Sequence, residues 1–168
     1  VRRDEESFLI TASGKDKGRL SEADFLVCDL SGSAVDTNEP RRPSAETLVH
    51  SVIYQELADA GAVYHVHEPY AALCSDRDEQ LGFTTFQNLE MIKGLDIWSE
   101  PAVSVPIIEN HADIPALARA IRGRIDPSVP GVNILRHGIY AWGETPFAAK
   151  RHVESLAYLY RFSWERSR

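Results

Sequence analysis

The chain has 168 residues, 43% of them hydrophobic and 26% charged, which is enough to bury a core and ordinary for a globular protein. Its formal net charge of −7 argues against binding to a nucleic-acid backbone, which needs clustered lysine and arginine. No apolar run approaches the roughly 20 residues that a membrane span requires.

The number of cysteines and the first residues of the chain indicate the cellular compartment. Cys28 and Cys74 lack metal-type spacing and are too few for a disulfide framework. We expect no signal peptide, because no charged segment leads into an apolar one at the start. We therefore expect a cytoplasmic protein with reduced thiols. Strand-like residues follow soon after Val1, and we expect the natural protein to continue upstream.

The first part of the chain predicts two strands and then a helix. Segments 7–13 and 24–32 are β-rich and are separated by a turn-rich connector. In 44–61, apolar residues recur at helical spacing. Ser44 is a suitable N-cap and Gly61 a suitable C-terminal stop, so we expect the helix to run between them.

The remainder alternates between strand and helix patterns. Strands are expected at 62–67 and 102–109, two more within 131–143, and helices at 68–76, 113–125 and 145–167. Thr145 caps the last helix, with Pro146 in its first turn. The segment 86–95 is ambiguous by periodicity. Strands mixed with helices in this way indicate a single α/β domain.

Three histidines suggest a metal site. His65 and His67 lie one residue apart in a predicted strand, so both imidazoles project from one face. His137 lies at a strand end before Gly138, which permits a close backbone approach or a positive φ. Three histidines with an open position describe a catalytic zinc site, and other divalent metals are compatible with them. Ordinary hydrogen-bonded histidines in a sheet are the alternative.

Other candidate residues have simpler interpretations. Three further histidines have no second potential metal ligand at a suitable spacing in the sequence, so we expect them to lie on the surface or to pack in the interior: His50, His111 and His152. Aromatic residues expected in the core, with lining of a substrate pocket as the alternative, are Phe83, Phe86 and Trp98.

Several segments together resemble the class II aldolase/adducin superfamily: "ITASGKDKGRL", "DFLVCDLSG", "RPSAET", "AVYHVH" and "RHGIYAWG". Within it, "NLEMIKGL", "VPIIEN" and "RHGIYAWGET" are most similar to the dehydratases of 5-methylthioribulose 1-phosphate in methionine salvage. The His-x-His pair alone is a common pattern, but its combination with Arg-His-Gly and "EMIKG" is specific. The similarity covers nearly the whole chain, so residues 1–168 are expected to form one domain of this kind.

The resemblance implies a fold, a cofactor and a reaction. The fold is a three-layer α/β/α sandwich around a mixed, mostly antiparallel sheet. One zinc ion per chain is held by His65, His67 and His137, and Glu90 is the catalytic acid/base. The substrate is a small ketose phosphate, 5-methylthioribulose 1-phosphate, which loses water to give 2,3-diketo-5-methylthiopentyl 1-phosphate. The protein is a homotetramer with active sites near subunit boundaries, and neither nucleic acid nor membrane is a partner.

The resemblance also suggests which residues hold the substrate phosphate. Ser13, Gly14 and Ser44 are candidates, with Lys17 as a further one, because a Ser-Gly turn and a helix start supply free amide donors. The superfamily's N-terminal helix and Gly-Asn turn, which also help hold the phosphate, would lie before Val1 and are absent from this sequence. A solvated connector is the alternative for "SGKDKG".

Two carboxylates compete for the chemistry. Glu46 falls where sugar-phosphate aldolases keep their acid/base carboxylate, so it either contacts substrate or shares the chemistry with Glu90; its alternative is an early-helix acid. The alternative for Glu90 is a surface acid beside Lys93. Two other functions remain open: a zinc-dependent sugar-phosphate aldolase or epimerase, which Glu46 favours, and a non-catalytic adducin-like interaction module.

Overall fold

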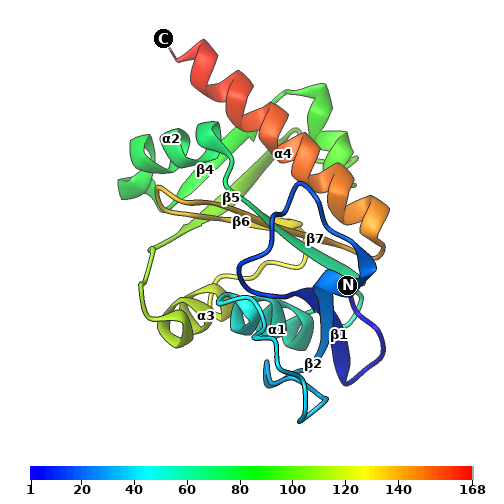
Figure 1. The fold of residues 1–168 in the computed structure, drawn as a ribbon. Helices are drawn as coiled ribbons and strands as arrows, with labels where there is room; N and C mark the ends of the chain where they lie inside the picture. Colours follow the sequence, from blue (N-terminus) through cyan, green and yellow to red (C-terminus); the bar gives the residue numbers. More distant parts are fainter. Residues whose placement is uncertain (168) are drawn as a thin grey trace.

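The computed structural model describes residues 1–167, whose centre is a five-stranded sheet with helices on both faces (Figure 1). In spatial order the strands are β3 (Ala62–Val66), β7 (Gly138–Gly143), β6 (Gly131–Ile134), β5 (Ala102–Ile108) and β4 (Phe83–Gln87). β5 and β6 are parallel, and the other neighbouring pairs are antiparallel. The predicted mixed, mostly antiparallel sheet is confirmed.

Helices make the two outer layers of the sandwich. Within residues 1–167 the α-helices are α1 (Thr47–Glu56), α2 (Pro69–Arg77), α3 (Ile114–Arg122) and α4 (Pro146–Arg166). In Figure 1, α1 and α3 pack together below the sheet, and α2 and α4 lie above it. No helix of the described chain combines the length and apolarity needed to cross a bilayer.

Each face of the sheet has its own core, and β7 contributes to both. Ile139 packs into the cluster beneath α2 and α4, whereas Tyr140 joins the cluster beneath α1 and α3. Successive strand residues point to opposite faces, so a strand covered on both sides is apolar throughout. All six residues of β7 are buried, which explains why this segment lacks a polar face.

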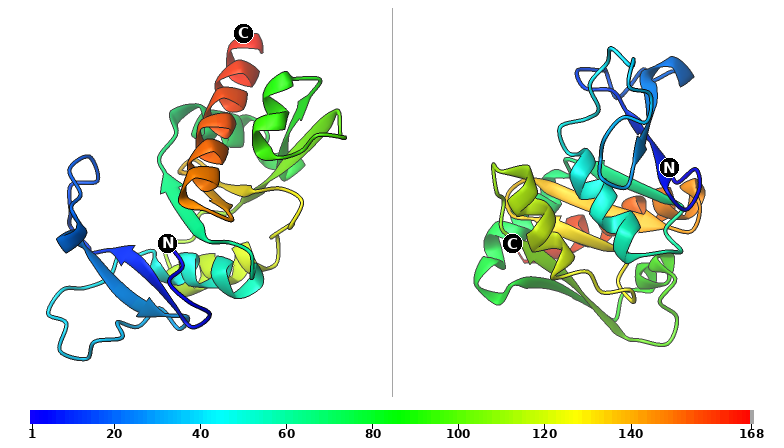
Figure 2. Two further views of the ribbon diagram at one scale, coloured as in Figure 1. Left: turned by 90° about the vertical axis from the view of Figure 1, so that its right-hand side faces the viewer. Right: turned by 90° about the horizontal axis from the view of Figure 1, so that it is seen from below.

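A second, two-stranded sheet lies beside α1. It pairs β1 (Ser7–Thr11) with β2 (Phe25–Asp29) in antiparallel register. The short 3-10 helix η1 (Glu22–Asp24) lies between the two strands in the chain and leads directly into β2. Figure 2 shows this sheet standing next to α1 and away from α4. The Phe8 ring packs 5.0 Å from Tyr54 of α1, between ring centroids, and both are buried in one core.

The start of α1 differs from the prediction. Glu46 is the N-cap and the helix begins at Thr47, so the assignment of Ser44 as the cap was wrong. Instead, the Ser44 backbone N–H donates to the Thr11 carbonyl over 3.0 Å, which ties this residue to the end of β1. Local capping preference was overridden by this long-range pairing.

The end of α1 also comes earlier than predicted. The helix ends at Glu56, not at Gly61. The glycine is required for another reason: a Cβ there would overlap the carbonyl oxygen of Glu144 at the end of β7. Gly61 therefore allows two chain segments to approach, and it does not terminate a helix.

The ambiguous segment 86–95 divides into two elements. β4 ends at Gln87, and the 3-10 helix η3 (Glu90–Leu95) follows after Asn88, whose φ is 54°. A further 3-10 turn, η2 (Glu79–Leu81), precedes β4.

The three aromatic residues expected in the core divide between core and surface. Phe86 is buried, as predicted, but the prediction was wrong for Phe83 and Trp98, which are 41% and 70% exposed. Phe83 is exposed because the side chains of β4 alternate between the two faces, and only Thr84 and Phe86 face inward. Trp98 lies outside the helices and strands, between η3 and β5.

Replacing Gly138 tests the packing of β3 against β7. A Cβ at this position would overlap the Val66 carbonyl oxygen. Gly138→Ala should therefore lower the free energy of unfolding by about 1–3 kcal/mol. Urea unfolding measures the change. Gly123→Ala is the matched control, because its Cβ would meet nothing closer than 3.8 Å. Equal stability of the two variants would contradict this account.

Candidate metal centre

His65, His67 and His137 meet at one end of the β3–β7 pair. His65 lies in β3 opposite Tyr140, His67 follows the strand, and His137 ends the turn between β6 and β7. One potential ligand atom from each lies within 4.8 Å of the others. The Nε2 atoms of His67 and His137 are 3.0 Å apart. Residues 70 positions apart in sequence thus form one cluster of imidazoles.

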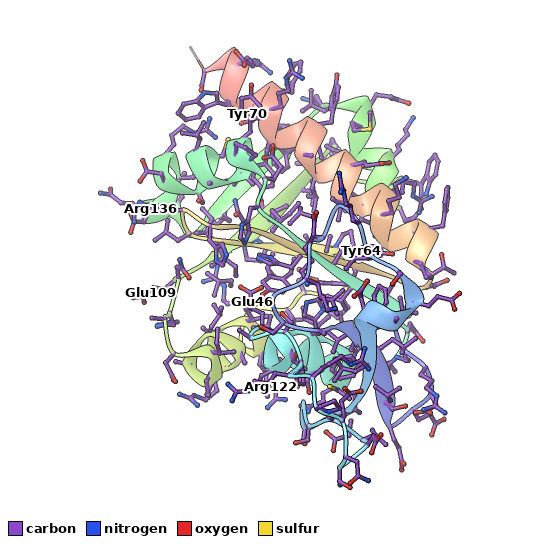
Figure 3. All side chains as sticks on the ribbon, in the orientation of Figure 1. Glu46, Tyr64, Tyr70, Glu109, Arg122 and Arg136 are labelled. Atoms are coloured by element: carbon purple, nitrogen blue, oxygen red, sulfur yellow. The ribbon has the colours of Figure 1, made fainter. Side chains whose placement is uncertain are left out.

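Backbone features place His137 in this cluster. Arg136 has a φ of 56°, and its N–H donates to the buried Ser75 hydroxyl of α2 over 2.9 Å. Figure 3 shows Arg136 at the turn between β6 and β7, on the side of α2. Gly138 then lies against the Val66 carbonyl, where no side chain fits. The expected close approach at Gly138 is confirmed, whereas the positive φ belongs to Arg136.

The donor set fits a divalent metal. His65 Nδ1–H donates to the Ile139 carbonyl over 3.0 Å, which fixes the tautomer and leaves the Nε2 lone pair free. That Nε2 atom is buried and makes no hydrogen bond within the described residues. Tetrahedral Zn–N bonds of about 2.0–2.1 Å would space two ligand nitrogens about 3.3 Å apart, close to the His67–His137 separation.

Glu46 faces the same cluster. It is the N-cap of α1, but its side chain makes no capping hydrogen bond. Its Oε2 lies 3.4 Å from His65 Nε2, and its Oε1 lies 3.8 Å from His137 Nε2. Figure 3 shows the side chain between α1 and the sheet. A carboxylate therefore stands beside the three imidazoles, within reach of whatever they bind.

Burial keeps two of these imidazoles neutral. It lowers the pKa of His65 to about 4, against an opposing effect of the Glu46 carboxylate. It also lowers the pKa of His137. Burial disfavours the charged form of an imidazole, so near neutral pH these side chains carry the lone pairs that a metal needs.

Tyr140 forms the floor of the site. Its ring stacks on His65 with ring centroids 4.2 Å apart and an angle of 18° between the planes. The ring of His50 in α1 makes a T-shaped contact with the Tyr140 ring, with centroids 5.5 Å apart. Its hydroxyl is buried, and burial together with the charge of the nearby Glu46 carboxylate raises the phenol pKa. Sequence reasoning did not select Tyr140, because its place depends on the β3–β7 register.

The phosphate candidates lie on two adjacent segments. Ser13 N–H donates to the Arg42 carbonyl over 2.8 Å, beside a β-bridge between residues 12 and 43. Gly14 has a φ of 75°, and Lys17 donates to the Thr11 hydroxyl. Ser44 lies on the second segment, two residues before Glu46. The structure thus groups these candidates near the start of α1, and their role stays a prediction.

Glu90 lies apart from this cluster in a single chain. It begins η3, its side chain is 84% exposed, and it pairs with Lys93 over 2.8 Å. Among the remaining histidines, His111 lies 3.8 Å from Glu109, and His152 is buried against the Trp142 carbonyl. Neither belongs to the three-histidine group, in agreement with the sequence prediction.

Comparison with known proteins places this arrangement in a family. The profile for the "Class II Aldolase and Adducin N-terminal domain" matches residues 1–164. The chain is 45% identical over 168 residues to a methylthioribulose-1-phosphate dehydratase of Geobacillus kaustophilus, covering 99% of this chain and 79% of that one. Identity to the methylthioribulose-1-phosphate dehydratase of Persephonella marina is 44% over 156 residues, covering 92% and 72%.

Solved structures share the fold at low sequence identity. The L-fuculose-1-phosphate aldolase of Thermus thermophilus superposes with a TM-score of 0.74 at 22% identity. The match covers 98% of this chain and 81% of that chain. At this identity the likeness concerns the fold alone, and it agrees with the predicted sandwich.

Removing one imidazole tests the metal centre. His137→Asn should weaken zinc binding by more than about 100-fold, since losing a ligand should cost at least as much as losing a residue that only orients a ligand through a hydrogen bond. Chelator competition gives the affinity, and elemental analysis after dialysis gives the metal content. His111→Asn is the control, because His111 lies outside the cluster. Equal zinc affinity in the His137 variant and the unaltered protein would contradict the site.

The metal-free protein should lose stability as the pH falls from about 6.5 toward 3. Burial lowers the folded-state pKa of His50 to about 3, below the unfolded value of about 6.5. Between these values only the unfolded state holds the proton, so the free energy of unfolding rises with pH. Urea unfolding at several pH values should show a shallower dependence for His50→Gln. The same slope in this variant as in the unaltered chain would contradict the assignment.

Proposed function

The chain belongs to the class II aldolase and adducin family, and from that premise we propose that it is a zinc-dependent dehydratase of 5-methylthioribulose 1-phosphate. The observation that carries the proposal is the meeting of three imidazoles with a carboxylate beside them, in a chain that closely matches dehydratases of this name. The product is 2,3-diketo-5-methylthiopentyl 1-phosphate, formed with release of one water. We further propose that residues 1–168 act as one cytoplasmic catalytic domain.

The imidazoles would hold the metal and fix its position. A divalent ion bound by His65, His67 and His137 supplies a Lewis acid for the carbonyl group of the substrate. The Ile139 carbonyl holds His65 in the tautomer that presents Nε2, and Tyr140 packs against the same ring. These contacts allow the ligand set to be rigid before any substrate enters.

The carbon skeleton stays intact while a proton and a hydroxyl leave. A base removes the proton from the third carbon, and an acid protonates the hydroxyl that departs from the fourth carbon as water. Tautomerisation of the resulting enol gives the 2,3-diketone. We assign both proton transfers to the Glu90 carboxylate, and we assign contact with the substrate hydroxyls to Glu46, which faces the imidazoles.

Glu90 would act on substrate held by a neighbouring copy. In one chain it extends from η3 into solvent, and its neighbours on the same surface are apolar: Met91 is 37% exposed and Trp98 is 70% exposed. A second apolar surface occurs on α4, where Tyr158 and Phe162 stack with centroids 6.3 Å apart. Large exposed apolar groups of this kind favour association, and we propose a homotetramer in which such contacts bring Glu90 to the histidines of its neighbour.

The substrate phosphate would bind at the start of α1. Ser13, Gly14, Ser44 and Lys17 lie on the two segments joined by the bridge between residues 12 and 43. The hydroxyl groups of the two serines, together with the lysine ammonium group, suit a phosphate dianion, whereas the backbone N–H groups of both serines already donate to carbonyl oxygens of the chain. Ser44 lies two residues before Glu46. A phosphate bound there would therefore place the reacting carbons of the same substrate within reach of Glu46 and the imidazoles.

A second candidate function is a zinc-dependent aldolase or epimerase acting on another sugar phosphate. The observation in its favour is Glu46, which lies 3.4 Å from His65 and occupies the position expected for an aldolase acid/base. An aldolase breaks a carbon–carbon bond, whereas the dehydratase retains every carbon. Identifying the reaction product therefore distinguishes the two functions.

The proposed reaction is tested by incubating zinc-loaded protein with 5-methylthioribulose 1-phosphate and determining the product by mass spectrometry. We expect one product, lighter than the substrate by one water. Cleavage into two fragments would favour the aldolase, and intact substrate would reject the dehydratase.

The role of Glu90 is tested by substitution. Glu90→Gln should retain zinc and lower kcat by about 10²–10⁴-fold, the usual contribution of a positioned acid/base group. Glu154→Gln is a matched control, because Glu154 is another exposed acid paired with a lysine, Lys150. Full activity of the Glu90 variant would remove this residue from the mechanism and leave Glu46 as the acid/base.

A further inference from the structure

The end of η3 is held against α4 by one carboxylate, and a histidine of α4 links this contact to β7. Asp96 follows η3 with a φ of 63° and pairs with Arg151 of α4. Its Oδ2 also lies 3.1 Å from Nε2 of His152. The Nδ1–H of His152 donates to the carbonyl of Trp142 in β7 over 2.6 Å. We refer to Asp96, Arg151 and His152 as the Asp96 anchor.

The anchor continues a tight contact between η3 and α4. Ile92 and Leu95 of η3 are 3% and 2% exposed and belong to the core under α4. Gly94 lies directly on Ser155 of α4, where a Cβ would overlap the serine hydroxyl oxygen. One side of η3 is therefore held by close packing and its end by the anchor, whereas the side chains of Glu90 and Met91 in its first turn, and of Lys93 after it, face solvent.

That first turn carries Glu90, whose side chain has little support of its own. At 84% exposure it pairs with Lys93, a residue of the same short helix. Its position relative to the rest of the protein is thus set by where η3 is held. Displacement of a reacting group by about 1 Å can cost about 100-fold in rate, so an exposed acid/base depends on the anchoring of its segment.

A direct chemical role for the His152–Asp96 pair is disfavoured by its surroundings. A cavity of about 950 Å³ is lined by Asp96, Arg151, His152 and Trp98, so a ligand could approach the pair. His152 is 4% exposed, however, and each ring nitrogen already faces an oxygen, one from Trp142 and one from Asp96. The geometry suits a link between elements better than proton exchange with a ligand.

We propose that Asp96 and His152 are positioning residues for the dehydration, which hold η3 so that Glu90 reaches the substrate of the neighbouring copy. The inference rests on the proposed function, in particular on the role of Glu90. It adds two residues that lie outside the metal cluster and outside the phosphate candidates, and neither of them touches the reacting atoms.

The test compares Asp96→Asn with the unaltered zinc-loaded protein. Asparagine keeps the shape of the side chain and tolerates a positive φ, but it removes the charge that holds Arg151 and faces His152. We expect kcat to fall by about 10- to 100-fold with KM and zinc content within about twofold. Amide hydrogen exchange should accelerate in residues 88–98 and stay unchanged in β3 and β7.

The control is Lys150→Gln, which breaks an ion pair on the same helix, with Glu154, and leaves η3 untouched. It should keep both kcat and the exchange pattern. Unchanged exchange in 88–98 for Asp96→Asn, or faster exchange with kcat within twofold, would overturn the inference. Faster exchange throughout the chain with loss of zinc would assign the anchor a general structural role and would overturn it as well. Absence of dehydration by the unaltered protein would instead refute the proposed function, together with the inference that rests on it.

Discussion

The close contact of β3 with β7 is the constraint on which the candidate site depends. The antiparallel register sets His65 opposite Tyr140, and Gly138 lets the turn after β6 come directly against Val66. His137 is then delivered beside His65 and His67, although it is distant in sequence. A side chain at Gly138 or a one-residue slip of this pair would move the imidazoles apart, because a slip exchanges the faces of a strand. The rest of the sandwich supports this contact from both sides through the buried residues of β7.

The sequence predicted what depends on local spacing and missed what depends on distant partners. His65 and His67 could be paired from strand geometry alone, and most helices and strands follow from periodicity. The N-cap of α1 could not be predicted, because Ser44 is drawn to the end of β1 by a backbone hydrogen bond. Tyr140 and the anchoring role of Asp96 also depend on tertiary contacts that carry no pattern in the chain. The family resemblance assigned Glu90 a role, but only the structure showed that its side chain is far more exposed than that of Glu46.

The two carboxylates differ in how they are held. Glu46 is fixed beside the imidazoles by its place at the start of α1, where its side chain is not used for capping. Glu90 is exposed and depends on η3 for its position. In the proposed enzyme the first acid belongs to the metal-bearing copy and the second to its neighbour, so the site is complete only in the assembly.

The most direct test of this account is subunit complementation. Co-expression of two differently tagged chains, His137→Asn and Glu90→Gln, gives mixed assemblies that can be isolated through both tags and loaded with zinc. If each site combines the histidines of one copy with Glu90 of the next, about a quarter of randomly assembled sites are intact, and dehydration of 5-methylthioribulose 1-phosphate returns at a corresponding fraction of the normal rate. Mixed assemblies as inactive as either parent would show that a single chain must supply both groups, which contradicts the account.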